Sequence, residues 1–116
     1  MENAYFNRLL EDDTRNLTNG EKLVLREYLQ SKKEGFDTLT ITSICWEEDH
    51  AEIIRMLKEA DFHTFVLADT STGLMSTLHA FLNAGFEVKG PRIVKQPEYY
   101  WGKPVLGLEM RMRAAD

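Results

Sequence analysis

Two short polar segments of this 116-residue chain carry residue types that can bind a ligand. The first, residues 45–50, reads Cys-Trp-Glu-Glu-Asp-His, and the second, residues 69–73, reads Asp-Thr-Ser-Thr-Gly. Each follows a predicted strand, and ligands of parallel sheets gather outside the carboxyl ends of the strands. The second segment offers hydroxyls and backbone N–H groups that can hold a phosphate or a carboxylate, although the same residue types also serve as ordinary helix caps. We predict a ligand crevice lined by Cys45, Trp46, Asp69, Thr70, Ser71 and Thr72.

These segments contain no complete catalytic or metal-binding set. Cys45 can be a nucleophile with His50 as its base, but nucleophilic thiols need a nearby cation, and three carboxylates stand between these two residues. A buried structural cysteine is the alternative. Glu47 and His50 have the spacing of half a carboxylate-bridged metal site, and the other half is missing. We therefore favour a protein without catalytic residues, metal or cofactor.

An aromatic cluster precedes the last predicted strand. It consists of Tyr99, Tyr100 and Trp101 and stands between Lys95 and Lys103. Aromatic residues interleaved with cations can anchor a partner protein or stack on bases. The alternative is a loop that folds over the core. We predict that this cluster binds a partner if it is exposed.

Composition narrows the class of protein. The formal net charge of −5 argues against a nucleic-acid ligand, because nucleic-acid binders usually carry a basic stripe. The single cysteine, Cys45, excludes an internal disulfide. The start of the chain lacks the features of a signal peptide, and no apolar run approaches the roughly 20 residues that span a bilayer. We predict a cytoplasmic protein without membrane contact.

One pattern recurs at three places and organises the elements that must position these segments. An amphipathic helix ends at a turn-forming residue, a Phe follows, and an extended apolar run begins; the junctions are Gly35-Phe36, Asp61-Phe62 and Gly85-Phe86. A Gly at this position adopts the left-handed conformation that ends a helix, and the next apolar residue packs on the last turn. Asp61 adopts it less readily. The predicted caps that begin the four helices are Asn3, Thr18 with Glu21, Asp49 with Glu52, and Asp69 with Thr70 and Ser71.

The extended runs predict different places in a sheet. Residues 62–68 are almost all apolar, which is typical of a central strand. Residues 87–94 are interrupted by Gly90-Pro91, which favours an edge or bulged strand. Residues 105–112 alternate, which favours an antiparallel strand with one wet face. Residues 38–44 alternate Thr with Leu or Ile.

Together these elements predict a single α/β domain over residues 1–116, in which a helical segment, residues 3–34, precedes the αβ units. Helix-linked strands with right-handed crossovers should be parallel. We predict a four-stranded mixed sheet, with three parallel strands plus one antiparallel C-terminal strand and about four helices. The threonine face of Thr38, Thr40 and Thr42 is covered either by a second copy of the chain, which makes a homodimer, or by solvent.

Two resemblances add to this prediction. The whole chain, especially residues 35–39 and 69–74, resembles a group of small uncharacterised bacterial proteins associated with conjugative and other mobile elements, which implies no activity. Residues 81–88 and 100–104, with the final strand, are similar to the closing segment of the N-acetyltransferase superfamily, which implies part of an acyl-coenzyme A enzyme fold. In place of that family's glycine-containing pyrophosphate loop, residues 46–50 read Trp-Glu-Glu-Asp-His, and their three carboxylates would repel phosphates.

The sequence thus favours a non-enzymatic binding or regulatory module that acts through a protein partner, as an accessory protein of a mobile element. The alternative is a small-ligand-binding or acyltransferase-like enzyme that uses the crevice at the carboxyl ends of the parallel strands.

Overall fold

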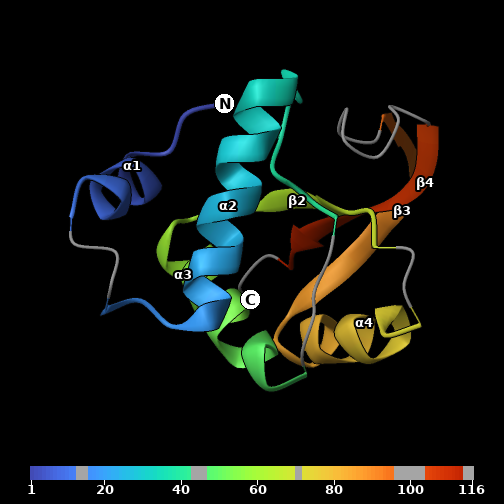
Figure 1. Cartoon of the computed structure of the whole chain (residues 1–116). Helices are drawn as coiled ribbons and strands as arrows, with labels where there is room; N and C mark the ends of the chain where they lie inside the picture. The colour runs from blue at the N-terminus through green and yellow to red at the C-terminus, as the bar shows by residue number, and fades with distance from the viewer. Residues whose placement is uncertain (13–15, 43–46, 70–71, 96–103, 114–116) are drawn as a thin grey trace.

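The helices and strands follow one another in the order that the sequence predicts (Figure 1). The computed structural model describes residues 1–12, 16–42, 47–69, 72–95 and 104–113. The helices are α1 (Ala4–Glu11), α2 (Asn19–Glu34), α3 (His50–Glu59), which follows the 3-10 turn η2 (Glu47–Asp49), and α4 (Leu74–Asn83). The strands are β1 (Thr40–Ile41), β2 (Thr64–Leu67), β3 (Phe86–Lys95) and β4 (Pro104–Met112).

The strands form one mixed sheet in the order β1-β2-β4-β3. Among the strands that the structure describes, β1 and β2 alone make a parallel pair, and β4 pairs antiparallel with both β2 and β3. The prediction of three parallel strands side by side is therefore wrong. The physical reason lies in β3. Pro91 has no backbone N–H to donate to a second neighbouring strand, and a register shift falls between Val88 and Gly90. Strand β3 therefore lies at the edge of the sheet, and β4 occupies the position next to β2.

Close packing of β4 on β2 depends on Gly107. A Cβ atom at this position would lie 2.8 Å from Val66 Cγ1 and 3.2 Å from the carbonyl oxygen of Leu67. The apolar side of β4 meets the apolar side of β2, with Met110 opposite Phe65 and Leu108 opposite Leu67. The predicted central position of β2 and the predicted edge position of β3 are both confirmed.

The opposite edge of the sheet is closed by α2. The hydroxyl of Ser31 accepts a hydrogen bond from Thr40 N at 3.0 Å and lies 3.4 Å from Thr40 O, to which it can donate. Thr40 N and Thr40 O point away from β2. The carbonyls on either side of Thr40, Leu39 O and Ile41 O, accept hydrogen bonds from Val66 N and Ala68 N. An edge strand covered in this way cannot pair with another chain.

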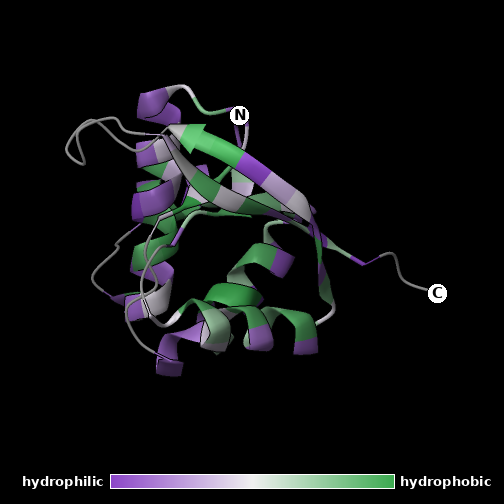
Figure 2. Cartoon of the chain, turned by 90° about the vertical axis from the view of Figure 1, so that its right-hand side faces the viewer, coloured by the Kyte–Doolittle hydropathy of each residue, from purple (hydrophilic) through white to green (hydrophobic). Residues whose placement is uncertain are grey.

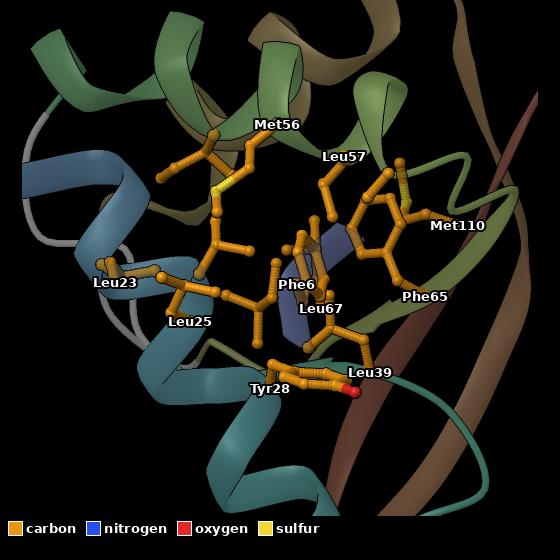
Figure 3. Close-up of a cluster of buried hydrophobic side chains, with 14 of the residues drawn as sticks. Phe6, Leu23, Leu25, Tyr28, Leu39, Met56, Leu57, Phe65, Leu67 and Met110 are labelled. Carbon is orange, nitrogen blue, oxygen red and sulfur yellow. The ribbon is translucent and has the colours of Figure 1, made fainter. Parts of the chain in front are cut away.

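One face of the sheet holds the hydrophobic core, to which all four helices contribute. Figure 3 shows Phe6 of α1, Tyr28 of α2 and Leu57 of α3 gathered over Phe65 and Leu67 of β2. The ring of Phe6 meets that of Tyr28 edge-on, with centroids 5.0 Å apart. In Figure 2, α4 is largely hydrophobic, whereas α2 alternates hydrophobic and hydrophilic segments.

The three helix ends adopt the predicted left-handed conformation. The φ angles are 73° at Gly35, 57° at Asp61 and 98° at Gly85. At the first two junctions the amide of the following Phe closes the turn, from Phe36 to Ser31 O and from Phe62 to Leu57 O, both at 3.0 Å. The junction pattern in the sequence therefore identified real chain reversals.

The predicted helix starts are half right. Asn3 and the Thr18–Glu21 capping box form as expected. Asp49 makes no capping bond, because η2 holds its backbone in the helical region, where its side chain does not face the open N–H groups. The cap of α4 is Gly73 rather than Asp69, Thr70 or Ser71.

The threonines of residues 38–42 bond within the chain. Thr38 donates to Thr64 O at 3.0 Å, Thr42 donates to the Glu27 carboxylate at 3.1 Å, and Thr40 is buried. The polar face of the sheet also carries ion pairs, including Arg92 with Asp37 at 2.5 Å.

Among the described helices, none has the length and apolar character needed to cross a bilayer.

Candidate functional site

The parallel pairing of β1 with β2 brings the two predicted ligand segments to the same edge of the sheet. Thr40 pairs with Val66 and Ile41 with Leu67, so the chain leaves both strands on the same side. The helices that follow meet there, because His50 Nε2 lies 3.2 Å from Thr77 Oγ1. Both side chains are buried. We call this region, from His50 to Asp69 and Thr77, the rim.

The Thr77 hydroxyl lies between His50 of α3 and the start of α4. The Thr77 hydroxyl lies 3.1 Å from Gly73 O, which can only accept. A single hydroxyl proton given to Gly73 leaves the Thr77 oxygen as an acceptor, so the contact with His50 is satisfied when Nε2 carries a proton. His50 Nε2 thus joins α3 to α4 through the Thr77 hydroxyl.

The structure describes only part of the predicted crevice. Asp69 is buried at the end of β2, and Thr72 is exposed. The remaining predicted ligand residues, Cys45, Trp46, Thr70 and Ser71, lie outside the described residues, as do the predicted partner-binding residues Tyr99, Tyr100 and Trp101. Within the described ranges, no three His, Cys, Asp or Glu side chains are grouped closely enough to hold a metal ion.

A second candidate site, which the sequence reading missed, lies between α1 and α2. It is an open groove of about 400 Å³. Its apolar lining comes from Leu10 and Leu17 on one side and from Leu25 and Leu29 of α2 on the other. Leu25 is 3% exposed and forms the floor, whereas Leu29 is 48% exposed. We call this site the leucine groove.

Three cations of the described chain line the leucine groove. They are Lys22, Arg26 and Lys33, all on α2 and all exposed. Among the described residues, none of the three makes an ion pair, and the nearby carboxylates Glu11 and Asp12 at the end of α1 do not reach them. The groove therefore presents apolar surface beside unmatched positive charge, in a chain whose formal net charge is −5.

Tyr28 fixes the α1 wall of the groove. Its hydroxyl accepts from Asn3 N at 2.9 Å and donates to Asn7 Oδ1 at 2.8 Å. The side chain of Asn3 also donates to Ala60 O of α3 at 2.9 Å. Because α1 is held at its first turn by two helices, the groove is a built feature of the fold.

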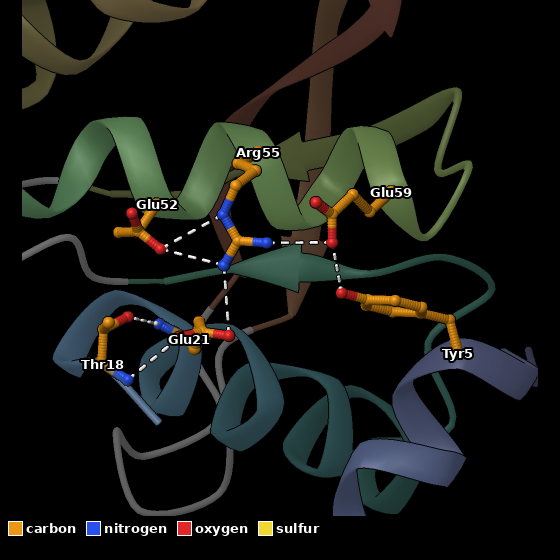
Figure 4. A network of polar contacts seen from close by, with 6 residues as sticks. All are labelled: Tyr5, Thr18, Glu21, Glu52, Arg55 and Glu59. Atoms are coloured by element: carbon orange, nitrogen blue, oxygen red, sulfur yellow. Dashed lines mark hydrogen bonds and ion pairs between the residues drawn. The ribbon is translucent and has the colours of Figure 1, made fainter. Parts of the chain in front are cut away.

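On the side of α2 that faces α3, a cation is paired with carboxylates of the chain itself. Figure 4 shows Arg55 of α3 among Glu21, Glu52 and Glu59, at nitrogen to oxygen distances of 3.2, 2.9 and 2.9 Å. These partners raise the pKa of the Arg55 guanidinium. Tyr5 donates to Glu59 at 2.5 Å, and this bond, together with Arg55, lowers the pKa of Glu59.

The same network sets the pKa of two further groups. Hydrogen bonding to Glu59 raises the pKa of Tyr5. Partial burial tends to raise the pKa of Glu21, but hydrogen bonds from Thr18 and Arg55 outweigh burial, and the pKa is lowered. Every charge in this cluster is thus partnered within the chain.

Comparison with protein families places these sites in context. Residues 23–111 match a domain of unknown function, DUF7698. The chain belongs to the DUF7698 family. The DUF7698 match contains the rim and α2 from Leu23 onward, whereas α1, Leu17 and Lys22 precede it. The leucine groove therefore joins one wall inside the match to one outside it. Searches of curated proteins and of solved structures found no match to this chain.

Proposed function

We propose that this DUF7698 chain is a non-enzymatic binding or regulatory module that acts through a protein partner at the leucine groove. The observation that supports this function is the pairing of open apolar surface at Leu29 with the cations Lys22, Arg26 and Lys33, which make no ion pair within the described chain. Apolar surface surrounded by polar groups is the usual anatomy of a protein interface.

A protein fits this surface better than a nucleic acid does. Nucleic-acid sites follow the phosphate backbone with an extended basic stripe. Here the cations surround a leucine-lined hollow, and the chain as a whole is acidic. The groove supports a role for a protein partner that carries both apolar and acidic side chains.

The resemblance of residues 35–39 and 69–74 to small bacterial proteins of mobile elements supports a cellular setting for this role. In that setting the protein works in the cytoplasm, as an accessory factor of such an element. The partner is then either another product of the element or a second copy of this chain.

Site-specific crosslinking tests the proposal in cells that express the protein naturally. A photo-crosslinking residue replaces Gln30, which lines the groove and leaves its leucines and cations intact. The matched control position is His79 on α4, because each of these side chains makes a hydrogen bond to the residue four positions later. We expect a discrete adduct from position 30 that is absent from position 79 and is lost with Arg26→Glu.

The outcomes of this experiment are distinct. An adduct with another protein that depends on Arg26 supports the proposal, and an adduct of two copies of the chain identifies the partner as a homodimer mate. Equal adducts from both positions, or none from position 30, would contradict it.

The second candidate function is a small-ligand-binding or acyltransferase-like enzyme at the rim. The parallel β1–β2 pair supports it, since the chain segments that follow both strands leave the sheet at one edge. The similarity of residues 81–88 to the N-acetyltransferase superfamily is a further argument. Thermal shift with coenzyme A, nucleotides and phosphorylated metabolites tests this function. Stabilisation that disappears in Thr70→Ala/Ser71→Ala would favour it over the protein-binding role.

A further inference from the structure

We infer that the leucine groove binds a short amphipathic helix of the partner, with apolar side chains on one face and carboxylates flanking them. This inference rests on the proposed function and names the class of partner segment. Four properties of the groove support it: the spacing of its cations, their electrostatic setting, the depth of its floor and the elements that border it.

The cations and the exposed leucine form one row along α2. Lys22, Arg26, Leu29 and Lys33 are separated by four, three and four residues, the spacing that places side chains on one face of a helix. At a rise of 1.5 Å per residue, the row is about 16 Å long. A partner helix of about three turns matches this length.

The row is electrostatically unfavourable in the isolated chain. Lys22 stands in the first turn of α2, where the helix dipole disfavours a positive charge. It also lies four residues before Arg26, and like charges at this spacing repel each other. Neither has an ion-pair partner among the described residues. Carboxylates supplied from outside would relieve both conflicts.

The three carboxylates at the interface of α2 with α3 are not available for this purpose. Glu21 is committed to Arg55 and to the cap of α2, and it is only 13% exposed at the side chain. Glu52 and Glu59 also contact Arg55. No described carboxylate forms an ion pair with Lys22, Arg26 or Lys33, so a partner can supply the matching negative charge.

The shape of the groove favours a helix over an extended strand. Helices border it, and no strand edge of the described sheet lies along it, so a partner strand would find no backbone groups to pair with. Side chains that project from one face of a helix can reach the floor at Leu25. A flat bilayer surface cannot, because Leu25 is 3% exposed and lies below Leu29.

Selection from a random peptide library tests the inference. Peptides of about sixteen residues, long enough for four turns of helix, are displayed and selected on the full-length protein. We expect enriched peptides with apolar residues at positions i, i+3 or i+4, and i+7, and with Asp or Glu beside them. Synthetic copies should bind with an affinity that falls about tenfold with Arg26→Glu and is unchanged with Lys89→Glu, which reverses another exposed cation.

A charge swap provides the decisive control. Selection on the Lys22→Glu/Arg26→Glu/Lys33→Glu variant should enrich Lys and Arg in place of Asp and Glu, with the apolar spacing retained. If this variant does not fold, as judged by circular dichroism, Arg26→Glu alone is used. Basic or uncharged peptides on the wild type, an alternating strand-like pattern, or no enrichment over a Leu29→Glu variant would each overturn the inference.

The two proposals can fail separately. Suppose that the crosslink in cells depends on the groove but the library selection does not enrich acidic amphipathic peptides. The proposed binding function would then stand, and the helical partner would be refuted. Binding of anionic vesicles or RNA by the wild type, lost with Arg26→Glu and accompanied by no peptide enrichment, would refute both.

Discussion

Arg55 of α3 packs against one side of α2, and Arg26 projects from α2 into the leucine groove, but the two arginines differ in their ion-pair partners. Arg55 contacts Glu21, Glu52 and Glu59, which join α2 and α3 across their interface. Arg26 stands with Lys22 and Lys33 over apolar surface and forms no ion pair with any described residue. The charges at the α2–α3 interface are matched within the chain, whereas the three cations of the leucine groove have no ion-pair partner among the described residues. The difference separates a structural use of charge from one that awaits a partner.

The largest effect that sharpens this comparison should come from Arg55→Ala. It removes the shared partner of three carboxylates, one of them only 13% exposed. We expect a loss of about 1 to 2 kcal/mol in the free energy of unfolding, a limited value because the guanidinium itself is well exposed. Arg26→Ala should change stability by less than about 0.5 kcal/mol. Urea denaturation of both variants measures the contrast, and equal losses would break it.

A somewhat smaller effect is expected from Tyr28→Phe. This change leaves Asn3 N and Asn7 without the hydroxyl that joins α1 to α2, which should cost about 1 kcal/mol. The α1 wall of the leucine groove should loosen as well, so peptide binding should weaken. Tyr5→Phe is the matched control, because its exposed bond to Glu59 lies outside the groove. A Tyr28→Phe variant with unchanged binding would show that α1 does not shape the site.

The pH dependence of the closed cluster gives a third test. The pKa of Glu59 is held below its ordinary value of 4.5 by Tyr5 and Arg55, so the ionised form favours the folded state. Its contribution is present above pH 4.5 and is lost as the pH falls through the lowered folded-state pKa. Wild type should therefore unfold at higher urea than Glu59→Gln near neutral pH, and the gap should close in acid. A gap that does not depend on pH would contradict this assignment.

Much of the fold could be predicted from local chemistry, while the groove could not. The left-handed turns at Gly35, Asp61 and Gly85 could be predicted from the residue type at each position and from the Phe that follows it. The position of β4 between β2 and β3 depends on the close approach at Gly107, a long-range fit that periodicity does not reveal. Asp49 failed as a cap because a 3-10 turn, which has no strong sequence signal, precedes α3.

The leucine groove did leave one signal in the sequence. Residues 23–29 contain more apolar residues than a single buried stripe needs, and Leu29 stands outside that stripe, between Arg26 and Lys33. An exposed leucine with cations three residues before and four residues after it is a sign of a binding face. Its other wall, at Leu10 and Leu17, could be placed only by the tertiary contacts of Tyr28.

The smallest effect is expected from Lys22→Glu, and its direction is the informative part. A glutamate here would stand in the first turn of α2, where the helix dipole favours it, and four residues before Arg26, where it would form an ion pair. The free energy of unfolding should rise by about 0.5 kcal/mol, while binding of acidic peptides should weaken. Lys89→Glu, on β3, should do neither. Because a single change would improve the isolated helix, the lysine at this position is best explained by an interaction that the isolated chain does not contain. A variant that gains no stability, or one that gains stability and binds as well as wild type, would remove this reason for assigning the groove to a partner.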